Sequence, residues 1–150
     1  ELERVEADPD LAIEQFNATD GGGRTITLPD GTVVPRIPGV VRWMWDGEFC
    51  GAINARWQPG TPDLPPHVLG HIGYSVVPWK QRLGYATEAL AGMLGIVRAA
   101  GLPWVEITTQ PDNIGSQKVI LANGGVALGE FVEPEQYGGH LGLKYRIDLA

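Results

Sequence analysis

Alternating apolar and polar positions divide the chain into short segments with clear boundaries. Val40–Trp45 and Glu48–Trp57 are two β-prone runs separated by Asp46-Gly47, a pair favoured in two-residue hairpin turns. Val68–Val77 places Ile72, Tyr74 and Val76 on one face of an extended segment. The first half of the chain therefore predicts a β-hairpin followed by a third strand.

The spacing of apolar residues becomes helical over Gly84–Ala100, where Leu90, Met93, Leu94 and Val97 recur at intervals of three and four. Gly101 is placed to end this helix. Pro103–Thr109 reads as a strand, and a second helix is expected from Pro111-Asp112-Asn113 to Ala122 or Asn123. The remaining segments are two final strands, a short N-terminal helix and two loops: Val126–Val132, Leu141–Leu149, residues 9–17, Thr19–Pro38 and Gln58–Pro66. This order predicts an α/β (α+β) fold in which helices flank a mixed sheet.

Length and composition fit a single globular domain over residues 1–150. Apolar residues make up 43% of the chain, and no apolar run reaches the length of about 18 residues that spans a bilayer. A net charge of −7 disfavours nucleic acid as a partner. We therefore expect no nucleic-acid or membrane partner, and we expect the cytoplasm as the location.

The reactive and metal-binding residue types are few. Cys50 is the single cysteine, which fits a reducing compartment, and we interpret it as a small apolar strand residue rather than a nucleophile. With one cysteine and three histidines, the sequence predicts no metal site.

The segment from Tyr74 to Ala86 carries the strongest chemical signal. A strand ends before Pro78, and a helix opens at Gly84-Tyr85-Ala86, where small residues allow a ligand to approach the backbone. The first amides of a helix have no partner within the helix and lie at its positive end, which suits a pyrophosphate. The alternative at this point is an ordinary strand–helix connection.

The spacing Val76-x-Pro78-x-x-Gln81-x-x-Gly84-x-Ala86 resembles the first signature of the GNAT superfamily of acyl-CoA N-acyltransferases. Their second signature, Asn-x-x-(Ser/Ala) opening a helix after a strand, is similar to Asn113-Ile-Gly-Ser116. The resemblance covers roughly residues 40–149, and it implies a GNAT-like fold whose largely antiparallel sheet has splayed central strands. The N-terminal helical part is short compared with the family, so we expect a truncated start.

The resemblance implies a binding site for acetyl-CoA as co-substrate. The backbone of the strand before the loop would pair with the pantetheine arm, which maps to Tyr74, Ser75 and Val76. Asn113 and Ser116 match positions that contact the cofactor, and Asn113 also suits a helix N-cap. The loop amides that would hold the pyrophosphate belong to Arg82, Leu83, Gly84, Tyr85, Ala86 and Thr87.

The reaction implied by the family is direct attack of a primary amine, of a small molecule or peptide, on the thioester. A backbone amide near Val76 would bind the carbonyl oxygen. Many relatives carry a tyrosine as general acid where this chain has Ile120, so Tyr145 and Tyr137 are candidates by elimination, each with the alternative of a packed aromatic. Glu106 and His71 are candidates for the base, and a strand histidine in a structural role is the alternative for His71.

The amine acceptor is expected between the hairpin Val40–Trp57, the proline-rich loop and the last strand pair. Trp43, Trp45, Trp57 and Arg56 are candidate lining residues, although Trp43 and Trp45 share a strand face that also suits a packed core. Two further alternatives stay open: a non-catalytic acyl-CoA-binding module and a homodimer.

Overall fold

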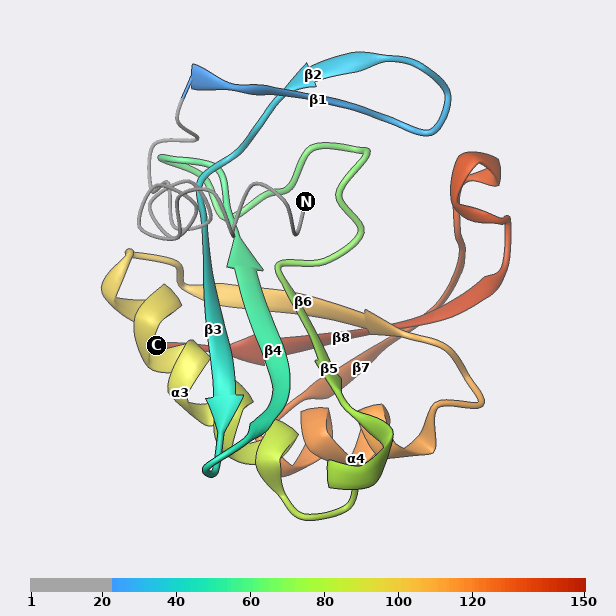
Figure 1. Cartoon of the computed structure of the whole chain (residues 1–150). Coiled ribbons are helices and arrows are strands. Elements are labelled where there is room, and N and C mark those ends of the chain that lie inside the picture. Colours follow the sequence, from blue (N-terminus) through green and yellow to red (C-terminus); the bar gives the residue numbers. More distant parts are fainter. Residues whose placement is uncertain (1–22) are drawn as a thin grey trace.

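The computed structural model describes residues 23–150 of the chain (Figure 1). These residues form two helices, eight strands and two short 3₁₀ turns, η2 and η3. Their bounds, in chain order, are β1 (Thr25–Thr27), β2 (Val33–Pro35), β3 (Gly39–Trp45), β4 (Phe49–Arg56), β5 (Ile72–Val76), η2 (Pro78–Lys80), α3 (Tyr85–Ala99), β6 (Trp104–Thr109), α4 (Ile114–Ala122), β7 (Val126–Val132), η3 (Glu135–Tyr137) and β8 (Leu141–Asp148).

The strands form three antiparallel groups. The orders are β3-β4-β5 and β6-β8-β7, and the hairpin β1-β2 stands apart. The two larger groups meet at one point, where the amide of His71 donates to the carbonyl oxygen of Glu106 at 2.7 Å. Beyond this point β5 and β6 form no ladder, so a gap opens between them. The expected splay of the central strands is confirmed.

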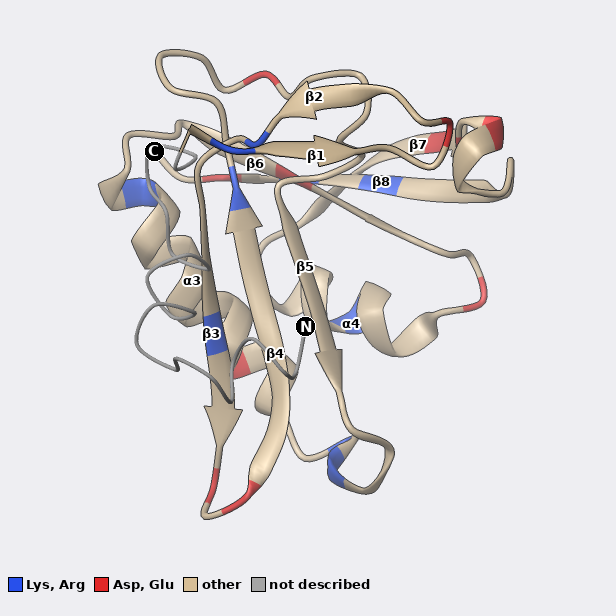
Figure 2. Cartoon of the chain, turned by 45° about the horizontal axis from the view of Figure 1, so that its top comes forward, with Lys and Arg blue, Asp and Glu red and all other residues tan. Residues whose placement is uncertain are grey.

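One apolar core joins both sheets to the helices. Leu90, Met93 and Val97 of α3 and Ile120 of α4 are buried in it with Val105 and Ile107 of β6. The amide side chain of Asn123, which follows α4, donates to the Thr87 carbonyl of α3, so the two helices pack together. Figure 2 shows both helices behind β3, β4 and β5, on the same side of that sheet. In residues 23–150, neither helix combines the length and apolarity needed to cross a bilayer.

The predicted order of hairpin, strand, helix, strand, helix and strand pair is confirmed, with two differences. The segment predicted as a loop before residue 38 contains the β1–β2 hairpin, which turns at Asp30-Gly31 between β-branched residues. The third strand begins at Ile72 rather than Val68. The helix predicted over residues 9–17 lies outside the described residues.

A packed-core interpretation of the paired tryptophans is wrong. Trp43 and Trp45 are each 65% exposed, while Met44 between them is buried. Strand alternation places both tryptophans on the sheet face opposite α3, and no helix of the described part covers that face.

Candidate functional site

The loop before α3 is shaped by two residues with left-handed backbone. Arg82 has a φ of 63° and Gly84 a φ of 86°. Such turns curve the backbone so that successive N–H groups point into the concave side, where an anion can bind. The first helical hydrogen bond runs from the Glu88 amide to the Gly84 carbonyl. Helix geometry leaves the preceding amides without an intrahelical acceptor, and the rest of the described chain supplies none for the backbone of residues 82–87. The loop therefore presents a row of open donors at the positive end of α3.

An ionic cluster fixes this loop to the β3–β4 turn. Lys80 donates to both oxygens of the Asp46 carboxylate, at 3.0 and 2.9 Å, and lies 3.3 Å from Glu48. The Tyr85 hydroxyl donates to the same carboxylate. The Tyr85 hydrogen bond and then Lys80 hold the pKa of Asp46 well below its usual range, and Asp46 raises the pKa of both Lys80 and Tyr85. The loop is therefore positioned before any ligand arrives.

The backbone of β5 is open on the side of the gap. The Arg56 amide donates to the His71 carbonyl and the Val77 amide to the Cys50 carbonyl, so odd-numbered residues of this strand face β4. Alternation then turns the N–H and C=O groups of Tyr74 and Val76 towards the gap, where the Val76 carbonyl already accepts the Gln81 side-chain amide at 3.1 Å. The Ser75 backbone faces β4, so the predicted pairing of Ser75 with a ligand is not available.

Tyr74 connects the two sides of the gap through its side chain. Its hydroxyl lies 2.9 Å from the Ser116 hydroxyl, in the first turn of α4. The side chain of Asn113 accepts a hydrogen bond from the Ser116 amide at 3.1 Å, which is the N-cap contact that the sequence predicts. Burial raises the pKa of the Tyr74 phenol. The phenol is therefore protonated at neutral pH and lies on the helix side of the gap.

His71 is fully engaged by the protein. Its Nε2 lies 2.9 Å from the Pro62 carbonyl and its Nδ1 accepts the Glu106 amide at 2.9 Å, an arrangement that a neutral ring satisfies completely. Burial lowers its pKa. The ring is 1% exposed, so the candidate base predicted here instead holds β5 and β6 together where they meet.

The other candidate acid–base residues also have structural partners. Glu106 binds Arg146 at 2.8 Å and lies 3.6 Å from Lys144, both on the neighbouring strand β8. Tyr145 is 6% exposed and packs in the core, and Ile120 is completely buried. The Tyr137 hydroxyl donates to the His67 carbonyl at 2.8 Å. None of these arrangements leaves a free proton-transfer group at the gap.

A cavity of about 530 Å³ lies beneath the β1–β2 hairpin, and we refer to it as the hairpin pocket. Asn54 and Arg56 of β4 line one side, Thr108 of β6 and Tyr137 of η3 line another, and His67 belongs to the loop between them. The pocket is thus lined by the predicted hairpin Val40–Trp57 and by the connection between the last two strands, whereas no residue of the proline-rich loop Gln58–Pro66 lines it and the β1–β2 hairpin that covers it was not predicted. Of the predicted lining residues, Arg56 is present and Trp57 is in the core.

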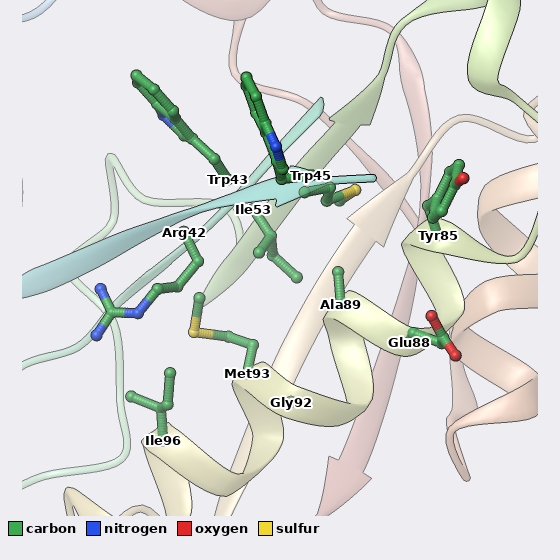
Figure 3. A pocket seen from close by; sticks show the side chains of 11 residues that line it. Arg42, Trp43, Trp45, Ile53, Tyr85, Glu88, Ala89, Gly92, Met93 and Ile96 are labelled. Carbon is green, nitrogen blue, oxygen red and sulfur yellow. The ribbon is translucent and has the colours of Figure 1, made fainter. Parts of the chain in front are cut away.

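A second groove of about 390 Å³ separates the edge strand β3 from α3 (Figure 3). Ile53, Met93 and Ile96 form its apolar floor, while Trp43 and Trp45 point away from it. This groove lies beside β3, whereas the gap lies on the far side of β4 and β5. It is therefore separate from the open backbone of β5.

The described residues offer little for metal or thiol chemistry. His67 and His71 are four residues apart, a spacing that can bind zinc, yet both His71 nitrogens contact the backbone. Within residues 23–150, no three His, Cys, Asp or Glu side chains form a metal-binding group. Cys50 is completely buried and its pKa is raised by burial, which supports its interpretation as an apolar strand residue.

Comparison with known proteins gives one family and a consistent fold. Residues 35–126 match the family model described as the acetyltransferase (GNAT) domain. Solved structures with similar folds include RimJ of Mycobacterium smegmatis in complex with CoA-disulfide, at 24% identity and a TM-score of 0.59 over 73% of this chain and 53% of that one. The microcin C7 self-immunity acetyltransferase MccE, in complex with acetyl-CoA and AMP, aligns at 17% identity and a TM-score of 0.57 over 73% of this chain and 61% of that one.

The ribosomal-protein-S5-alanine acetyltransferase of Vibrio fischeri gives 24% identity and a TM-score of 0.54 over 67% of this chain and 55% of that one. No curated protein sequence gives a significant match. The chain thus spans between about half and two thirds of the length of these solved structures, which share its fold.

Proposed function

The chain belongs to the GNAT acetyltransferase family, and from this premise we propose that it transfers the acetyl group of acetyl-CoA to an amine. Enzymes of the family use acetyl-CoA as co-substrate. Two sets of open backbone donors carry the proposal. One is the row of amides of residues 82–87, and the other is the set of amides on the gap side of β5.

The described residues fit this co-substrate. Open amides at the start of α3 suit the negative charge of a pyrophosphate. A Cβ built on Gly84 meets no protein atom within 4 Å, so the space in front of the loop is clear. On the gap side of β5, Tyr74 offers a backbone donor and acceptor and Val76 offers a donor, which suit the amides of a pantetheine arm; the Val76 carbonyl is already bound by Gln81. Asn113, at the start of α4, lies next to Ser116 on the other side of the gap.

The amine nitrogen attacks the thioester carbon, the carbon–nitrogen bond forms as the carbon–sulfur bond breaks, and the leaving thiolate takes a proton. The Val76 amide, which faces the gap, is placed to donate to the carbonyl oxygen as charge develops. The amine passes its proton to water, because His71 and Glu106 already have partners. The chain then contributes mainly by holding both reactants in one orientation.

For the proton of the thiolate we propose the Tyr74 phenol, assisted by Ser116. The buried Ile120 occupies the position where many relatives have the acid, so that position cannot donate. Tyr74 is the tyrosine whose hydroxyl reaches the α4 side of the gap, 2.9 Å from Ser116. The Ser116 hydroxyl can donate to the Tyr74 oxygen and so stabilise the phenolate that remains after proton transfer.

A non-catalytic acyl-CoA-binding module is the second candidate, favoured by the buried Ile120 and the engaged His71. A thiol-release assay with acetyl-CoA and a panel of amines separates the two. Release that depends on an amine supports transfer. Micromolar CoA binding without release for any amine class favours the module, and an absence of CoA binding contradicts both.

A further inference from the structure

We propose that the hairpin pocket binds the acceptor through an acidic group, a carboxylate or phosphate, held by the guanidinium of Arg56. This inference rests on the proposed function and adds the class of acceptor: an amine that also carries an acidic group. The charge of the pocket, which differs in sign from that of the protein, supports it.

Arg36 and Arg56 are the charged residues that line the hairpin pocket, and no Asp or Glu of the described chain lines it. The protein as a whole has a net charge of −7. Figure 2 shows basic residues at the end of β4 and beside the β1–β2 hairpin, with acidic residues at the tip of that hairpin and at the β3–β4 turn at the opposite end of the sheet. The pocket is therefore a local basic site on an acidic molecule.

Arg56 is half-buried and has no carboxylate partner among residues 23–150. Its Nε donates to the Gly70 carbonyl at 3.0 Å, which fixes the direction of the guanidinium. Lys80, Lys144 and Arg146, in contrast, each pair with a carboxylate. Burial lowers the pKa of Arg56 without removing its charge. A partly desolvated cation of this kind gains most from an anion that enters beside it.

A second polar group in the pocket also lacks a partner. The Nε2 atom of His67 is buried and makes no hydrogen bond with the described chain. Its carbonyl is fixed by the hydroxyl of Tyr137, another lining residue. Buried polar atoms are nearly always satisfied, so His67 points to a ligand group as its partner.

The rest of the wall is largely apolar and leads towards the start of the β5–β6 gap. Ile26, Leu28, Ile37, Val40 and Leu69 line the pocket, so the body of the acceptor is expected to be apolar. Thr108 and Asn54 lie at its other side, and the Asn54 side chain accepts the Gly73 amide of β5 at 3.1 Å. An acceptor anchored at Arg56 therefore enters the start of the β5–β6 gap. His71, which pairs with Arg56, lies five positions before Val76, about 16 Å along β5, so the acceptor has to be extended to bring its amine to the Val76 amide.

Binding of small ligands that carry the proposed anchoring group tests this assignment on the full chain. The first pair is N-acetylleucine and N-acetylleucinamide, and the second is N-acetyl-O-phosphoethanolamine and N-acetylethanolamine. Each pair compares an anion with its neutral match. Affinities follow from NMR titration, read at the Arg56 Nε–H and Gly70 amide signals. The variants are Arg56→Gln and Arg56→Lys, and Arg98→Gln is the control. Arg98 also donates its Nε to a backbone carbonyl, that of Leu149, but it does not line the pocket.

We expect at least one anion to bind tenfold more tightly than its neutral match, and the pair that does so identifies carboxylate or phosphate as the group. The preference should vanish in Arg56→Gln, persist in part in Arg56→Lys, and remain in Arg98→Gln. Equal affinity within both pairs, or an unchanged preference in a folded Arg56→Gln, overturns the assignment. Acetyl-CoA is titrated into the same samples: if it binds while neither anion does, only the acceptor class fails, whereas an absence of acetyl-CoA binding removes the proposed function.

Discussion

Lys80 donates hydrogen bonds to both carboxylate oxygens of Asp46, and this pair fastens the loop before α3 to the β3–β4 turn. The two residues are 34 positions apart in the sequence. Tyr85, the first residue of α3, donates to the same carboxylate, so two donors converge on one acid. Asp46, in the β3–β4 turn, thus binds the loop before α3 at Lys80 and again at Tyr85. These two contacts hold the open amides of the loop in position.

Replacing Asp46 with Asn should loosen this loop without unfolding the protein. The amide retains size but loses the charge that attracts Lys80, and we expect CoA affinity to fall about threefold to tenfold. Glu48→Gln is the matched control, because the Glu48 side chain is 72% exposed and should be dispensable. Calorimetric titration with CoA measures both. Equal affinities for Asp46→Asn and the wild type would show that the cluster does not position the loop.

Substitution of Gly84 by Ala should weaken CoA binding by more than tenfold. The left-handed backbone at Gly84 disfavours any side chain, and an added Cβ projects into the space in front of the loop. Gly95→Ala is the control, because Gly95 lies inside α3 and a Cβ added there meets no neighbouring element within 4 Å. That change should stabilise the fold by about 0.5–1 kcal/mol and leave CoA binding unchanged.

Removal of the Tyr74 hydroxyl should affect turnover more than binding. We expect Tyr74→Phe to lower kcat by tenfold to a hundredfold while KM for acetyl-CoA changes less than threefold, because the phenol is proposed to act only as the thiolate leaves. Ser116→Ala should give a smaller loss in the same direction. Tyr145→Phe, in the core, should have normal kcat. Tyr74→Phe with wild-type kcat and reduced stability would assign Tyr74 a structural role instead.

His71 should make the stability of the protein depend on pH. Its pKa is lowered in the folded state, so the unfolded chain binds the proton more tightly and stability falls as the pH drops below the ordinary value of 6.5. The wild type should therefore lose stability relative to His71→Asn between pH 7 and pH 5, as measured by denaturant unfolding. Parallel pH profiles of the two proteins would mean that His71 titrates alike in the folded and unfolded states.

Local patterns were enough to predict the framework of the fold. Asp46-Gly47 between two β-prone runs predicts the β3–β4 hairpin, and the spacing from Leu90 to Val97 predicts α3. The Asn113 cap is a local signal as well, since it contacts a residue three positions away. The β1–β2 hairpin was missed because its strands have only three residues each, within a segment rich in glycine and proline.

The candidate acid–base residues could not be predicted in the same way. The partners of His71 are Pro62, nine positions away, and Glu106, 35 positions away, and only the folded chain brings them together. The same holds for Tyr74 and Ser116, which are 42 positions apart. Exposure of Trp43 and Trp45 depends on which face the helices cover, and strand alternation alone does not specify that face.

In the proposed complex, open backbone groups of the α3 loop and β5 hold CoA, and an NMR titration of isotopically labelled protein with CoA decides whether they do. We expect saturable binding, with the largest amide shifts at Gly84, Tyr85, Ala86 and Thr87 and further shifts at Tyr74 and Val76. An absence of binding at millimolar CoA, or shifts confined to the groove between β3 and α3, would contradict it.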